Sequence, residues 1–160
     1  MATRSKLPFF IRLGNAFTTL LLKRGVNMRT NVLLTVPGRK SGTPRTTPVT
    51  VIEYQGGRYI QSPFGDVDWV RNLRAAGSAT LTRGKHAETV SSIELSAEEA
   101  APVIKSALAI APAMIRAYYD VSPDAPLPEL VREARRHPTF RLESDPSEDK
   151  VQRNVGKASV

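Results

Sequence analysis

The chain has 160 residues, of which 41% are hydrophobic and 24% charged, and it carries a formal net charge of +8 with a pI of about 10.2. This length and composition fit one globular domain. The positive charge favours an anionic partner such as a phosphorylated cofactor, nucleic acid or an acidic membrane surface. The absence of cysteine excludes disulfides, thiolate nucleophiles, iron–sulfur clusters and cysteine-based zinc sites, and it fits a cytoplasmic protein.

The first 29 residues are interpreted as an N-terminal helix region. Residues 7–22 read LPFFIRLGNAFTTLLL, but Arg12 and Asn15 interrupt the apolar run. The run is also short of the ~20 apolar residues that a membrane span needs, and no small-x-small cleavage site follows it. Cations on both sides of the run leave open a peripheral membrane contact through this helix.

Strand-like segments occupy most of residues 30–143. They are rich in β-branched and aromatic residues, and tight turns are expected at Gly56-Gly57 and Gly84-Lys85. The predicted strands cover residues 29–36, 46–54, 58–62, 78–83, 89–95 and 139–143. Because short turns and one short helix separate the third, fourth and fifth strands, we predict a mostly antiparallel α+β barrel rather than a doubly wound sheet.

Three helices are predicted around these strands. Asp66 or Asp68 is expected to cap the first helix, which Gly77 ends. Ser96 and Glu99 form a capping-box pattern at the start of the second helix. The second helix is expected to run to about residue 109, before Pro112, the third to cover residues 127–136, and residues 144–160 to form a disordered tail.

The loop between the first two predicted strands has the composition of an anion-binding loop. Residues 37–45 read PGRKSGTPR, so two glycines, two small hydroxyl residues and three cations lie within nine positions. Glycine lets backbone N–H groups approach a ligand, and the cations neutralise its charge. The loop has neither the GxxxxGK[ST] nor the GxGxxG spacing. The pattern predicts phosphate capture by Arg39, Lys40, Ser41 and backbone amides, and the alternative is a basic surface turn.

The segment WVRNLR, residues 69–74, is the second candidate. On a helix, Arg71 and Arg74 share one face while Trp69 lies on another. One interpretation places Trp69 and Asn72 near a ring system and Arg71 near an anion. The alternative is a tryptophan that fills the core beside two solvated arginines.

The remaining candidates are aromatic. Tyr118 and Tyr119 lie between two proline-marked breaks, and a tyrosine can protonate a reduced substrate, line an aromatic pocket or simply pack at a helix end. His86 and His137 have no carboxylate or second histidine at ligand spacing, so we expect no metal site. An anion-binding loop without an obvious nucleophile or acid–base pair is typical of an enzyme whose cofactor supplies the chemistry.

Two blocks of the sequence, TVPGRKSGTPRTTPV and EYQGGRYIQSPFGDVDWVRNLRAAG, together resemble the nitroreductase-family, deazaflavin-dependent oxidoreductases of actinobacteria. The resemblance covers about residues 30–143 and closes at HPTFRLE. It implies a split β-barrel similar to that of flavin-binding pyridoxamine-phosphate oxidases. It also implies the deazaflavin coenzyme F420, with FMN as the alternative cofactor, and hydride transfer to an electron-poor double bond, quinone or nitroaromatic compound.

The resemblance further implies which residues bind the cofactor. They fall on the basic loop, on the strand after it, at the end of the third strand and at the start of the first barrel helix. They are Arg39, Lys40, Ser41, Arg45, Thr46, Thr47, Pro48, Val49, Thr50, Ser62, Pro63, Phe64, Gly65, Asp68, Trp69, Val70, Arg71 and Asn72. Because the cofactor carries a phosphodiester and a polyglutamate tail, it would explain both the basic loop and the net charge.

Departures from the family pattern bear on the substrate. Thr50 and Phe64 stand near positions where nitroimidazole-activating members have a tyrosine and a serine. We therefore expect reduction of a small hydrophobic enone or quinone, with the proton supplied by solvent, Tyr118 or Tyr119. The rival hypothesis is a protein that carries F420 or a lipophilic ligand without turnover. Aromatic residues make up 6% of the chain and do not alternate with the cations, which argues against nucleic acid. We expect a monomer or a homodimer.

Overall fold

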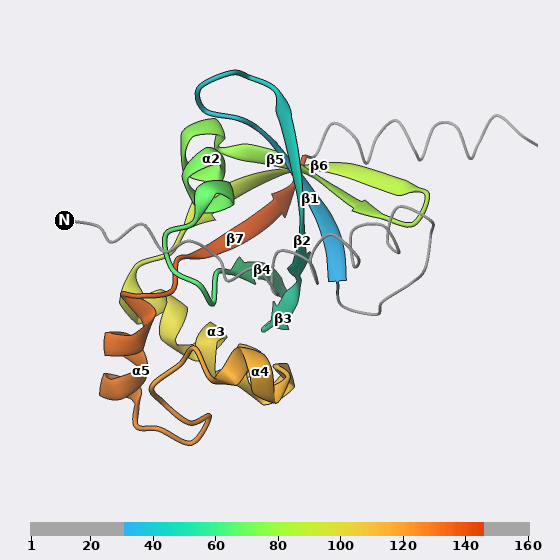
Figure 1. Ribbon diagram of the computed structural model, residues 1–160. Helices are drawn as coiled ribbons and strands as arrows, with labels where there is room; N and C mark the ends of the chain where they lie inside the picture. Colours follow the sequence, from blue (N-terminus) through green and yellow to red (C-terminus); the bar gives the residue numbers. More distant parts are fainter. Residues whose placement is uncertain (1–30, 146–160) are drawn as a thin grey trace, which may run out of the picture.

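The computed structural model describes residues 31–145, which form a curled seven-stranded antiparallel sheet with helices beside it (Figure 1). The strands are β1 (Asn31–Pro37), β2 (Pro44–Thr50), β3 (Ile52–Tyr54), β4 (Gly57–Gln61), β5 (Ser78–Arg83), β6 (His86–Glu94) and β7 (Thr139–Ser144). The helices are α2 (Asp68–Ala76), α3 (Ala97–Ile110), α4 (Ala113–Arg116) and α5 (Leu127–Ala134). The predicted N-terminal helix, its membrane contact and residues 146–160 of the predicted tail lie outside the described residues. Ser144, predicted as the first residue of this tail, instead ends β7 and pairs with Val90.

The order of the strands explains how the sheet closes on itself. Neighbours follow the order β2-β1-β5-β6-β7-β4-β3, and every pair is antiparallel. The first and last strands of this order, β2 and β3, are consecutive in the chain and only Val51 separates them. The predicted single strand over residues 46–54 is therefore wrong. The chain bends at Val51 because its first half pairs with β1 and its second half with β4. This closure through one bent segment makes the fold an antiparallel split barrel, as predicted.

One of the two predicted hairpin turns is at the expected residues, and the other is shifted by one residue. Arg83 pairs with His86, which confirms a turn at Gly84-Lys85. Tyr54 pairs with Gly57, so the other turn consists of Gln55 and Gly56 rather than the predicted Gly56-Gly57. Both turn residues have positive φ angles, 46° and 75°, as a two-residue turn that follows the right-handed strand twist requires.

The helix ends also differ in part from expectation. The predicted aspartate cap of α2 is wrong: Val67 is the N-cap residue, with no side-chain cap bond, and Asp68 is the first helical residue. Gly77 ends the helix with a φ of 71°, as predicted. The capping box of α3 is confirmed by reciprocal bonds between Ser96 and Glu99 at 3.2 and 2.9 Å. The helix α5 ends two residues earlier than predicted, and the short α4 was not predicted.

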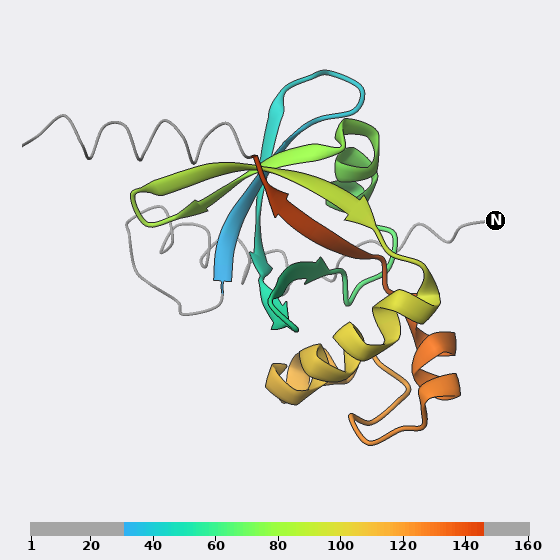
Figure 2. The same ribbon diagram turned by 180° about the vertical axis from the view of Figure 1, so that it is seen from behind.

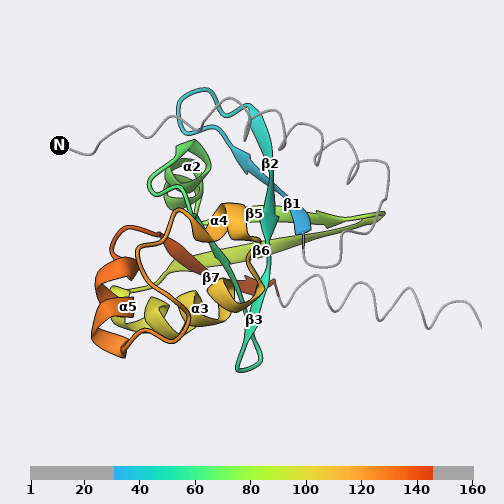
Figure 3. The same cartoon turned by 60° about the horizontal axis from the view of Figure 1, so that its bottom comes forward.

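Two main apolar cores divide the described chain. One lies inside the curled sheet, includes the fully buried Leu34 and Phe140, and receives Val70 and Leu73 from α2. The other joins α3, α5 and the segment between them into a helical lobe, which lies against one end of the sheet in opposite views (Figures 1 and 2). A small cluster around Ile52 and Val103 connects the two. Figure 3 shows the lobe from below, with α3, α4 and α5 grouped on this side.

Candidate functional site

The predicted anion loop is a compact hairpin connection between β1 and β2. The Gly38 amide donates to the Thr43 carbonyl at 2.9 Å, and the Gly42 amide donates to the Gly38 carbonyl at 2.8 Å. Gly42 has a φ of 70°, which a residue with a side chain rarely adopts. The Ser41 hydroxyl accepts from the Thr43 amide at 3.3 Å. The glycines therefore let the loop fold back on itself, with its polar backbone at the surface.

A buried asparagine of α2 holds this loop in place. The Asn72 Oδ1 atom accepts two bonds from Arg39, one from the backbone amide at 3.2 Å and one from Nη1 at 2.8 Å. Asn72 is only 5% exposed. The two sequence blocks that carry the family resemblance, GRKSG and W-x-x-NL, are thus physically joined through Arg39 and Asn72. The sequence separation of 33 residues gave no sign of this contact.

Carboxylates at and just before the start of α2 form ion pairs with the neighbouring arginines. Arg71 donates from Nε to Asp66 at 3.0 Å, and Arg74 bonds both Asp66 and Glu94. Asp68 lies 3.3 Å from Arg39 Nη2. Burial alone would raise the pKa of Asp66, but the hydrogen bonds and charges of Arg71 and Arg74 outweigh it and hold the pKa below its usual value. Arg71 is therefore a poorer anion ligand than the sequence indicated, because its charge is already paired.

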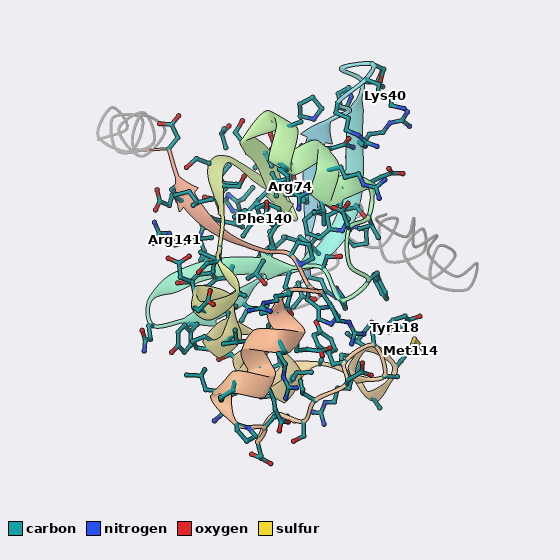
Figure 4. The ribbon with its side chains drawn as sticks, turned by 90° about the vertical axis from the view of Figure 1, so that its left-hand side faces the viewer. Lys40, Arg74, Met114, Tyr118, Phe140 and Arg141 are labelled. Atoms are coloured by element: carbon teal, nitrogen blue, oxygen red, sulfur yellow. The ribbon has the colours of Figure 1, made fainter. Side chains whose placement is uncertain are left out.

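Lys40 and Arg45 differ from these arginines. Within residues 31–145, neither forms a salt bridge, and both are exposed. Lys40 lies in the β1–β2 loop, at the end of the molecule away from the helical lobe that carries Tyr118 (Figure 4). Folded backbone amides, a hydroxyl and cations with unpaired charge form a donor set that fits a phosphate-bearing cofactor.

The positive charge of the chain is unevenly distributed along the sequence. Residues 1–30 hold six of the 23 cations and no acidic residue, whereas residues 31–145 hold 14 cations and 13 acidic residues. The described body is thus nearly neutral. Most of the +8 charge therefore falls on residues that the structure does not describe, so the described residues do not test the predicted common explanation of the basic loop and the net charge.

The other predicted contact residues on β2 and α2 have varied surroundings. On β2, Arg45 and Thr46 are exposed, Val49 is buried, and Thr50 is exposed again. The Thr46 hydroxyl bonds that of Thr35 at 2.8 Å. Trp69 is half-buried, packs against the sheet core and lies 6.1 Å from the Phe140 ring, while Val70 is fully buried. Trp69 therefore packs partly against the core, whereas Arg71 and Arg74 pair with carboxylates and are not the solvated arginines of the structural alternative.

The segment after β4 meets the helical lobe through its aromatic residue. Phe64 and Tyr118 make an edge-to-face contact with ring centres 4.8 Å apart. Ser62 is fully buried, and its hydroxyl donates to the Gly65 carbonyl at 2.7 Å, which closes the turn through Pro63. The predicted residues of this segment and Tyr118 are thus brought together.

The two tyrosines are not equivalent. Tyr118 is half-buried, and in Figure 4 it lies beside Met114, which is 61% exposed. Tyr119 is 9% exposed, and its hydroxyl donates to the Gln61 side chain at 2.8 Å. Burial, with a smaller effect from Glu133, raises the pKa of Tyr119. Tyr118 is therefore the more accessible hydroxyl of the pair.

One buried polar pair was not predicted from the sequence. His137 was read as lacking a carboxylate partner, yet its Nε2 atom lies 2.8 Å from Glu133 Oε1, and both side chains are buried. The spacing of four residues could have indicated the pair, although α5 ends between the two residues. Among residues 31–145, no group of three histidine or acidic side chains could hold a metal ion, and no helix is long and apolar enough to cross a membrane.

Comparison with solved structures finds the same fold in other proteins. One solved structure with the same fold is that of an F420-H2 dependent reductase, at 23% identity and a TM-score of 0.51, over 72% of this chain and 95% of that one. Another is described as a domain-swapped dimer, at 22% identity and a TM-score of 0.53, over 84% of this chain and 97% of that one. No curated protein sequence matches the chain.

The class defined by this fold is that of the split-barrel proteins. The F420H2-dependent quinone reductase family matches residues 17–134 of the sequence, which is most of the chain. The chain belongs to this family, and the resemblance read from its sequence is thereby confirmed. Membership supports an F420-dependent oxidoreductase. It leaves the acceptor and the residues that bind the cofactor to be proposed.

Proposed function

We propose that this protein uses reduced F420 to reduce a small, hydrophobic, electron-poor acceptor, either a quinone or an enone. The family match over residues 17–134 carries the proposal. The joining of the basic loop to α2 through Arg39 and Asn72 supports it, because this contact orders a donor set suited to a phosphate-bearing cofactor.

The proposed cofactor site has two parts. In the first, Lys40, Ser41, Arg39 and backbone amides of the β1–β2 loop hold the phosphate, and Arg45 lies next along the chain toward β2. In the second, β2, the segment from Ser62 to Gly65 and the start of α2 surround the ring system. The second part includes residues from Thr46 to Thr50 and from Asp68 to Asn72.

When bound, reduced F420 supplies the hydride. The residues of the chain then have to place the acceptor and deliver a proton to it. Phe64 and Tyr118 offer an apolar aromatic surface, which suits a quinone or enone. The Tyr118 hydroxyl is the better proton donor of the two candidates, because the Tyr119 hydroxyl is buried and already donates to Gln61.

The proposal is tested by single-turnover oxidation of reduced F420 against quinones, enones and nitro compounds. We expect quinones or enones to oxidise the bound cofactor fastest. Tyr118→Phe should slow this oxidation about a hundredfold or more, within the usual range for loss of a general acid. Tyr119→Phe removes a hydroxyl that bonds Gln61 and should slow the oxidation far less than Tyr118→Phe. Binding of reduced F420 without oxidation by any acceptor would instead identify a carrier.

A further inference from the structure

A buried polar network lies directly beneath the segment from Ser62 to Gly65. The His137 ring lies between two acceptors: Nδ1 is 3.2 Å from the Ser62 carbonyl oxygen, and Nε2 is 2.8 Å from Glu133 Oε1. His137 and Glu133 are 3% and 4% exposed, and Ser62 is fully buried. These three residues come from the end of β4, from α5 and from the turn before β7.

The geometry fixes how many hydrogens the pair holds. A carbonyl oxygen can only accept, so the His137 Nδ1 atom must carry a hydrogen. A second hydrogen must lie between Nε2 and the Glu133 carboxylate. Glu133 Oε1 also accepts from the Asp120 amide at 3.1 Å, and Arg136 lies 3.6 Å from Oε2. Each polar side-chain atom of His137 and Glu133 thus has a partner within 3.6 Å.

One face of the His137 ring packs against another aromatic residue. Tyr119 stacks on His137 with ring centres 4.2 Å apart, and the Tyr119 hydroxyl donates to Gln61. The Gln61 amide in turn donates to Thr139 Oγ1 at 3.0 Å. The helical lobe thus fixes the orientation of His137, and His137 fixes the carbonyl of Ser62.

We propose that His137 is a positioning residue, which with Glu133 holds the turn from Ser62 to Gly65 in the conformation that receives the cofactor. This inference rests on the proposed function, because that function places the turn against the cofactor. The hydrogen bond from His137 Nδ1 to the Ser62 carbonyl is what holds the turn. Loss of the donor would leave the Ser62 carbonyl buried without a partner, and the turn would have to open to reach water.

A purely structural role for His137 would have a different consequence. In that case the ring would only fill space beside Tyr119, and any replacement of similar size would lower stability alone. The folded protein would then bind the cofactor normally. The two roles are therefore separable, since one depends on the donor atom and the other on the volume of the side chain.

The test compares His137→Asn with His137→Leu, two side chains of the same shape. The asparagine amide can take the place of Nδ1 and donate to the Ser62 carbonyl, whereas leucine cannot. Two quantities are measured on the full chain: hydrogen–deuterium exchange of peptides that cover residues 60–68, and the dissociation constant for F420 well below the melting temperature. Peptides from β1 provide the internal reference for exchange.

We expect His137→Asn to keep both quantities within about threefold of the unmodified protein. We expect His137→Leu to speed exchange of residues 60–68 and to raise the dissociation constant about tenfold. If the leucine variant does not fold, His137→Phe, which keeps the stack on Tyr119, replaces it. Equal behaviour of the donor and non-donor variants in both measurements would overturn the proposal.

The outcome also separates this proposal from the proposed function. If the unmodified protein does not bind F420, the assignment of the cofactor fails. The exchange comparison then still decides whether the His137 donor holds the turn. If the protein binds F420 and only exchange differs between the variants, the donor orders the turn without serving the cofactor, and the positioning role is refuted.

Discussion

Replacement of Asn72 by leucine tests whether this buried amide acts on the cofactor through Arg39. Leucine keeps the branched shape of the Asn72 side chain but removes Oδ1, which accepts from the Arg39 amide and guanidinium at 3.2 and 2.8 Å. A neutral hydrogen bond contributes about 1 kcal/mol and one to a charged group about 1.5–3 kcal/mol. Because the Arg39 side chain is 28% exposed, water compensates part of this loss. We expect a net effect of about 1–2 kcal/mol, or roughly 5–30-fold in the dissociation constant for F420.

The assay is a fluorescence titration of F420 in a double-mutant cycle of Asn72→Leu and Arg39→Ala. If Asn72 acts by placing Arg39, the loss in the double variant is clearly smaller than the sum of the two single losses, because only the bond from the backbone amide of residue 39 is left for Asn72→Leu to remove. Additive losses in the double variant would refute the reasoning, because Asn72 would then contribute to binding independently of Arg39.

Three further predictions follow from the structure. Lys40→Ala should weaken F420 binding about threefold to tenfold without slowing turnover at saturating cofactor, whereas Lys85→Ala, at the exposed β5–β6 turn, should change neither. The pKa of Asp66 is held below its usual value, so its ionised form stabilises the fold above pH 3.8 and this contribution fades as the pH falls through the lowered pKa. Asp66→Asn should therefore lower the free energy of unfolding at neutral pH, and the difference should vanish in acid; a difference that is constant with pH would contradict this. Phe140→Ala, in a ring that is 1% exposed, should cost about 3–5 kcal/mol in urea denaturation, and a loss below about 1 kcal/mol would be inconsistent with its burial.

Much of the fold could be read from the sequence because its signals are local. The β-branched runs, the turn at Gly84-Lys85, the capping box at Ser96 and the stop at Gly77 each depend on a few adjacent residues. The break at Val51 could not be predicted in this way. It arises because the two halves of one apolar run pair with strands at opposite ends of the sheet order.

In the candidate site, too, local features could be predicted and contacts between distant residues could not. The basic loop was recognisable from its own composition, but its partner on α2 is 33 residues away and the bond between them has no local signal. The aspartates at the start of α2 looked like caps, whereas Asp66 pairs with Arg71 and Arg74 instead. Side-chain pairing across elements decides which cations are available to a ligand, and residue types alone do not reveal it.

The most direct test of the central claim is a titration of the purified full chain with F420 and, separately, with FMN. The account predicts that F420 binds with a micromolar or lower dissociation constant and that FMN binds far more weakly. It also predicts that Arg39→Ala together with Lys40→Ala weakens F420 binding, whereas Lys85→Ala leaves it unchanged. Tight binding of FMN without binding of F420 would contradict the account.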